Sequence, residues 1–196
     1  MYTTIMKSHA ILFITGAAVM ILQIIGVRIL ATELGTTSIV WSSMIATTIA
    51  SLAFGYYIGG ILADRATTKK MRALFIAGAG AAVALIVPLK SIVFILGATL
   101  PYGVRAIIVS IILFSIPTIL LAMTTIYTTR MESSSLSTIG STSGSLYAIS
   151  TLGSLLGVFM TSFYLIPSFG ISTIVYAPAV ILFLTGVNSE VTSSEY

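Results

Sequence analysis

The sequence predicts an all-α integral membrane protein with six transmembrane helices, which we expect to form a single domain over residues 1–196. Charged residues make up 7% of the chain and hydrophobic residues 57%, whereas soluble domains average about 25% charged residues. The hydrophobic stretches are also continuous over about 20 residues, the length of a helix that crosses a bilayer, whereas barrel strands alternate over about ten residues. We therefore expect lipid to solvate much of the surface, and we expect no soluble catalytic domain.

The first two spans are expected at 11–30 and 38–62. The apolar core of the first is longer than the 7–15 residues of a signal peptide, so we interpret it as an uncleaved span. Gly35 lies between the two spans and predicts a turn, because glycine adopts conformations that other residues avoid.

The third span is expected at 73–87, ending at Pro88, because proline removes a helical hydrogen bond. The apolar segment 92–100 that follows is too short to cross the membrane and predicts an interfacial or re-entrant segment. Pro101 ends it.

The last three spans are expected at 106–127, 146–166 and 171–187. Segment 133–145 is mostly Ser, Thr and Gly, a composition typical of a flexible linker. Prolines are expected to kink or end these spans: Pro117, Pro167 and Pro178.

Lysine and arginine predict the orientation, because they are enriched in cytoplasmic loops. With the N-terminus inside, the inner side holds six basic residues and the outer side three. We therefore expect a multi-pass protein of the cell membrane with both termini cytoplasmic. The inner residues are Lys7, Arg65, Lys69, Lys70, Arg72 and Arg130; the outer ones are Arg28, Lys90 and Arg105.

Two G-x-x-x-G patterns, Gly55 with Gly59 and Gly153 with Gly157, lie in the second and fifth spans. Such spacing lets another helix approach closely. The pattern favours either packing inside the bundle or contact with a second copy. Its recurrence is consistent with an internal repeat of two three-helix units, as in many transporters.

The loop after the second span reads G-I-L-A-D-R over 60–65 and resembles the cytoplasmic loop motif of the major facilitator superfamily, G-x-L-A-D-R-x-G-R-K. Thr67 stands where the motif has its second glycine. The resemblance implies a gating loop. Asp64 could accept hydrogen bonds at a helix N-terminus, and Arg65 could pair with an acidic group; an ordinary basic inner loop is the alternative. The implied gating residues are Gly60, Asp64, Arg65, Lys69 and Lys70.

A second resemblance covers most of the chain. Four parts of the sequence are similar to the membrane domain of spermidine-synthase-like membrane proteins. They are the pattern Q-x4-R-x6-G-T from Gln23, then Trp41, the pattern G-Y-Y-I-G-G-x2-A-D-R from Gly55, and the segment 144–170. This implies a bundle like half of a major facilitator. Family members commonly continue into a cytoplasmic aminopropyltransferase-like domain; this sequence does not, so that activity is not carried over. They also often have Glu in place of Gln23.

Polar and aromatic residues within the spans are candidate substrate-binding residues, because buried polar groups in a membrane are usually functional. The alternatives are a helix–helix hydrogen bond for the glutamine, an interfacial position for the arginine and simple packing for the tyrosines. The candidates are Gln23, Arg28, Tyr56, Tyr57 and Tyr147.

These features favour a transporter-type half domain that moves a small solute as a homodimer. The alternative is a membrane anchor for a separate soluble aminopropyltransferase-like protein. We expect no enzyme, because no catalytic set of side chains can be assembled, and no metal, cofactor or nucleic acid. The spans hold no carboxylate to compensate a polyamine, so a neutral or anionic solute, or a lipid, is as good a candidate.

Overall fold

The computed structural model describes residues 2–65, 68–133 and 139–191, with side chains for 6–65, 68–133 and 139–189. All regular structure in this part of the chain is helical, and six of its helices are long and apolar enough to cross a membrane. The structure thus confirms the predicted all-α fold with six candidate spans.

The first four spans are single helices, and each is longer than its predicted apolar core. α1 turns into α2 at Gly35, whose φ of 77° is a left-handed conformation that favours glycine. Thr68 caps the start of α3, where its side chain accepts a hydrogen bond of 3.3 Å from the backbone N–H of Met71. The four helices are α1 (Tyr2–Leu34), α2 (Ser38–Arg65), α3 (Lys69–Leu96) and α4 (Tyr102–Glu132).

The fifth span consists of three consecutive helical segments: α5 (Ile139–Phe159), the π-helical turn η1 (Met160–Leu165) and α6 (Ile166–Ser168). The chain then turns into the last helix, α7 (Ile171–Val191).

Two predictions about helix ends are wrong. Pro88 does not end the third span, because α3 continues through it to Leu96; the segment 92–100 is therefore not a separate interfacial element. Membrane helices tolerate a proline when neighbouring groups satisfy the freed backbone. The predicted linker 133–145 is also shorter than expected: α5 begins at Ile139, and residues 134–138 lie outside the described residues.

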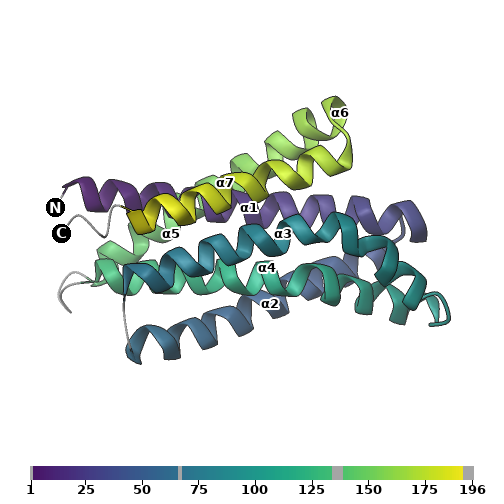
Figure 1. Ribbon diagram of the computed structural model, residues 1–196, viewed down its shortest axis with the longest axis horizontal. Coiled ribbons are helices and arrows are strands. Elements are labelled where there is room, and N and C mark those ends of the chain that lie inside the picture. The colour runs from purple at the N-terminus through teal and green to yellow at the C-terminus, as the bar shows by residue number, and fades with distance from the viewer. Residues whose placement is uncertain (1, 66–67, 134–138, 192–196) are drawn as a thin grey trace.

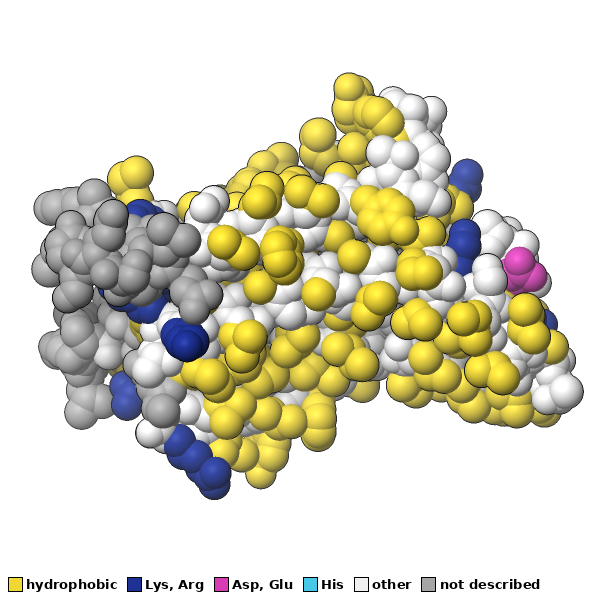
Figure 2. Space-filling view, viewed as in Figure 1, with side chains coloured by type: hydrophobic (Ala, Val, Ile, Leu, Met, Phe, Trp, Pro, Cys, Tyr) yellow, Lys and Arg dark blue, Asp and Glu magenta, His cyan; other side chains and the backbone are white. Residues whose placement is uncertain are grey.

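α1 and α4 form the centre of the bundle. α1 packs against α5, α4, α7 and α2, while α4 also packs against α2 and α3; α3 and α7 pack against each other. α1 begins and α7 ends at the same end of the bundle, which we call the terminal end, and α6 lies toward the other end (Figure 1). Hydrophobic side chains cover the middle of the visible face and charged side chains gather at its two ends (Figure 2), as expected of a protein that crosses a bilayer.

Candidate functional site

A cavity of about 150 Å³ lies between α2 and α5, with α1 and α4 forming its floor. Its lining is unusual for a chain this apolar, because more than half of the lining residues carry a hydroxyl group or are glycine. Tyr56, Tyr147 and Thr151 are exposed, so the cavity opens on the side of the bundle. The lining residues are Thr15, Gly16, Val19, Met20, Leu52, Tyr56, Ala122, Thr125, Tyr147, Ser150, Thr151 and Ser154.

Glycines position the two walls. Gly153 lies against the backbone of Phe13, and Gly157 lies where an added methyl group would be 2.7 Å from the carbonyl oxygen of Ala17. On the other wall, a methyl group at Gly55 would be 2.6 Å from the carbonyl oxygen of Ile119. Close backbone approach therefore holds α5 on α1 and α2 on α4.

Both G-x-x-x-G patterns thus pack inside the bundle. Gly59 completes the second wall, since its added methyl group would lie 2.9 Å from the Cα of Met123 on α4. Of the two interpretations that the sequence left open, the structure favours packing within one chain over contact with a second copy.

Four of the seven hydroxyl groups that line the cavity donate hydrogen bonds to backbone carbonyls. Thr125 donates to Leu121 at 3.2 Å, and Thr151 donates to Tyr147 at 2.8 Å. Ser154 donates to the carbonyl of Gly16 at 3.1 Å and so also joins α5 to α1. Each of these protons is therefore used within the protein, while the oxygen keeps lone pairs that can accept further hydrogen bonds.

The structure brings together two of the five predicted substrate-binding residues, Tyr56 and Tyr147, in one cavity. Tyr57 does not line it and is 70% exposed on the surface of α2. Gln23 is half-buried on α1, about one turn beyond the cavity residue Met20, and is not part of the lining.

Arg28 lies apart from the other predicted residues. It is exposed and lines a different cavity, of about 230 Å³, between α1 and the start of α7. Ile166, Phe169 and Gly170 are among the other residues of that cavity. The structure therefore does not bring Arg28 to the predicted tyrosines.

Sequence reasoning missed the serines and threonines of the cavity. On α5 they follow Tyr147 at helical spacing, as Ser150, Thr151 and Ser154. This is a polar stripe along one helix face, and a search for i, i+3, i+4 and i+7 periodicity of polar residues would have found it. Thr15 and Thr125 lie on other helices and carry no such signal.

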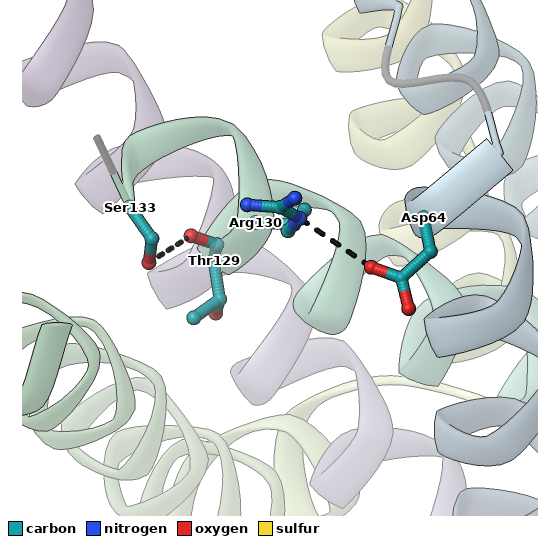
Figure 3. Close-up of polar contacts among 4 residues, drawn as sticks. All are labelled: Asp64, Thr129, Arg130 and Ser133. Atoms are coloured by element: carbon teal, nitrogen blue, oxygen red, sulfur yellow. Dashed lines mark hydrogen bonds and ion pairs between the residues drawn. The ribbon is translucent and has the colours of Figure 1, made fainter. Parts of the chain in front are cut away.

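The predicted gating loop forms a different contact from the expected one. The Oδ1 of Asp64 lies 3.5 Å from the Nε of Arg130, so the ion pair joins the ends of α2 and α4 (Figure 3). Both side chains are well exposed, at 77% and 54%. Arg65, Lys69 and Lys70 are exposed at the same end.

The structure bears on only one of the two glycine positions of the motif. An added methyl group at Gly60 would have no neighbour within 4 Å, so close packing does not require a glycine there. Thr67, the departure from the motif, lies outside the described residues.

A second polar cluster at the terminal end was not predicted. Arg72 on α3 is only 5% exposed and donates to the hydroxyl of Ser8 at 3.4 Å. Ser8 in turn donates to Oε1 of Glu132 at 2.5 Å. This cluster joins α1, α3 and α4, so Arg72, which was counted among the basic residues of the inner side, in fact holds helices together.

Comparisons of the chain with protein-family models, with curated proteins and with solved structures give no match. Among the described residues, no three His, Cys, Asp or Glu side chains group as metal ligands would. The cavity between α2 and α5 offers hydrogen-bonding groups and two aromatic rings, and this chemistry is suited to holding a polar solute.

Proposed function

We propose that this chain is a transporter-type half domain of the cell membrane, in which two copies enclose a shared pathway for a small solute. The observation that carries the proposal is the hydroxyl-lined cavity between α2 and α5. It opens on the side of a bundle whose middle is covered mainly by hydrophobic side chains (Figure 2), and polar groups facing hydrocarbon are costly. A second copy over this opening would separate those groups from lipid.

The pattern of helix contacts supports an arrangement of two three-helix units. The contact of α1 with α5 corresponds to the contact of α4 with α2. In the same way, the contact of α1 with α7 corresponds to the contact of α4 with α3. Gly153 lies in the contact of α5 with α1, and Gly55 lies in a corresponding place in the contact of α2 with α4. Such internal symmetry is common in transporters, where the site lies between the repeats.

The free faces of α2 and α5 support a second copy. α5 packs chiefly against α1, and α2 chiefly against α4, which leaves large side chains such as Phe54, Leu155 and Phe159 exposed. A two-fold axis through the cavity opening would place α2 of each copy beside α5 of the other, as a closed symmetric dimer requires. In this proposal both termini are cytoplasmic, and the bundle is akin to half of a major facilitator of the spermidine-synthase-like kind.

The dimer can be tested by disulfide cross-linking, because the sequence contains no cysteine. Ala53 on α2 and Ala148 on α5 are exposed and adjoin the cavity residues Leu52 and Tyr147. We expect an Ala53→Cys chain and an Ala148→Cys chain, co-expressed with different tags, to form a mixed cross-linked dimer in membranes. The control is Ala81→Cys, which is exposed on α3 and should not cross-link.

Native mass spectrometry in lipid nanodiscs provides the second measurement. A two-copy mass for the unmodified chain together with the mixed cross-link would support the proposal. A single-copy mass without a cross-link would contradict it, and the membrane-anchor interpretation would then be preferred.

A further inference from the structure

The cavity between α2 and α5 contains no charged side chain among the residues that line it. An ion of either sign would therefore be held there without a compensating charge, and burying an uncompensated charge is strongly unfavourable. The cavity is better matched to an uncharged solute than to a polyamine or a carboxylate.

Its hydrogen-bonding groups are mostly acceptors. The hydroxyl protons of Thr15, Thr125, Thr151 and Ser154 are donated to backbone carbonyls, so toward a ligand these side chains present only oxygen lone pairs. A bound solute must therefore bring several donors of its own.

Three further hydroxyl groups are free to donate as well as accept. Within the described part of the chain, Tyr56, Tyr147 and Ser150 make no hydrogen bond through their side chains. Their positions on α2 and α5 place them on the two opposite walls of the cavity. A ligand whose groups both donate and accept would satisfy the walls and the floor together.

We propose that this cavity binds a small uncharged polyol. Each hydroxyl group of a polyol donates one hydrogen bond and accepts others, which matches four acceptors and three hydroxyl groups that do both. Its carbon chain can lie against Val19, Met20 and Leu52. The volume of about 150 Å³ is below the ~300–1,000 Å³ of sites for drug-sized ligands, so the solute is small. This inference rests on the proposed transport function and specifies its substrate class.

The test is saturation-transfer NMR with the full chain in lipid nanodiscs, using erythritol, spermidine and succinate as the neutral, cationic and anionic probes. We expect erythritol to bind and the two ions not to bind. Thr151→Val should weaken erythritol binding about 3- to 10-fold, because it removes one acceptor while keeping the shape.

Matched controls separate the cavity from the rest of the surface. Thr185 on α7 makes the same kind of hydrogen bond as Thr151, to the carbonyl four residues earlier, at 2.7 Å, so Thr185→Val should leave binding unchanged. Tyr147→Phe should also weaken binding, whereas Tyr176→Phe, at nearly the same exposure (42% against 43%), should not.

The outcomes distinguish the substrate class from the transport function. Absence of erythritol binding, or erythritol binding that Thr151→Val and Tyr147→Phe leave unchanged, would overturn the polyol assignment. Binding of spermidine or succinate that these two variants reduce would also overturn it, while the cavity would remain a solute site. The transport function itself fails only if the cross-linking and mass measurements show one copy.

Discussion

Ser8 donates a hydrogen bond of 2.5 Å to Glu132, although 124 positions separate the two residues in the chain. The same hydroxyl accepts a hydrogen bond from Arg72, which is buried. The carboxylate of Glu132 is thus the negative charge beside a buried guanidinium, and Ser8 connects the two.

We therefore expect Glu132→Ala to lower the free energy of unfolding by about 1–3 kcal/mol, because it leaves a buried donor without its charged partner. Asp64→Ala should cost less than about 1 kcal/mol, because its ion pair with Arg130 is exposed. Unfolding of both variants by SDS in mixed micelles, followed by circular dichroism, would measure the difference. Equal losses of unfolding free energy in the two variants would contradict a structural role for the cluster of Ser8, Arg72 and Glu132.

The glycines of α5 should respond unequally to substitution. Gly153→Ala places a methyl group against the backbone of Phe13, and we expect a loss of about 1–3 kcal/mol from overpacking. Gly144 on the same helix has no neighbour within 4 Å of an added methyl group, so Gly144→Ala should be neutral or stabilise the helix by up to about 1 kcal/mol. The same unfolding assay applies, and a tolerated Gly153→Ala would show that α1 and α5 are not packed this closely.

The cavity should be accessible to water. Ser150 lines it, whereas Leu152 is 52% exposed on α5 and outside the lining. A charged thiol reagent should therefore modify Ser150→Cys at least about tenfold faster than Leu152→Cys in membranes, because the reactive thiolate requires a polar environment. Rates can be measured by mass spectrometry of the labelled chain. Similar rates would mean that lipid fills the cavity.

The orientation in the membrane can be tested at the two ends of the bundle. Thr99 is exposed in the turn between α3 and α4, and Gly140 is exposed at the start of α5, at the terminal end. With both termini cytoplasmic, an impermeant maleimide should label Thr99→Cys in intact cells and Gly140→Cys only after permeabilisation. The reverse pattern would invert the proposed topology.

The sequence was sufficient for the helical class and the number of spans because hydrophobic length is a local property. Errors arose where local rules compete with the surroundings. A proline such as Pro88 ends a helix more readily in water, because water can bind the backbone groups that lose their helical partners. In lipid no solvent can do so, and the helix continues. Likewise, the Ser and Thr residues after residue 138 have the composition of a linker. They belong to α5, and their hydroxyl groups can donate to its carbonyls, as Ser145 does to Thr142.

The candidate site was predicted only in part, for the same reason. Tyr56 and Tyr147 were identified by residue type, whereas their meeting in one cavity depends on which helices pack together. Thr15 and Thr125 could not be identified, because isolated threonines are common in membrane helices and often bond to their own backbone. Arg28 and Tyr57 were also predicted from residue type alone. The packing of the helices places Arg28 at a different cavity and Tyr57 on the exposed surface of α2.

The pairing of α1 with α5 also constrains how the protein is made. Ser154 and its partner Gly16 are 138 residues apart, and a ribosome adding about 5–20 residues per second needs roughly 7–28 seconds to synthesise that interval. During this time the face of α1 that will contact α5, which includes Gly16 and Ala17, is uncovered and must be sheltered by lipid or by the insertion machinery. The contact between α1 and α5 therefore cannot form before the fifth span has been made, so a nascent chain stalled before Gly153 should still be open to capture by quality-control proteases.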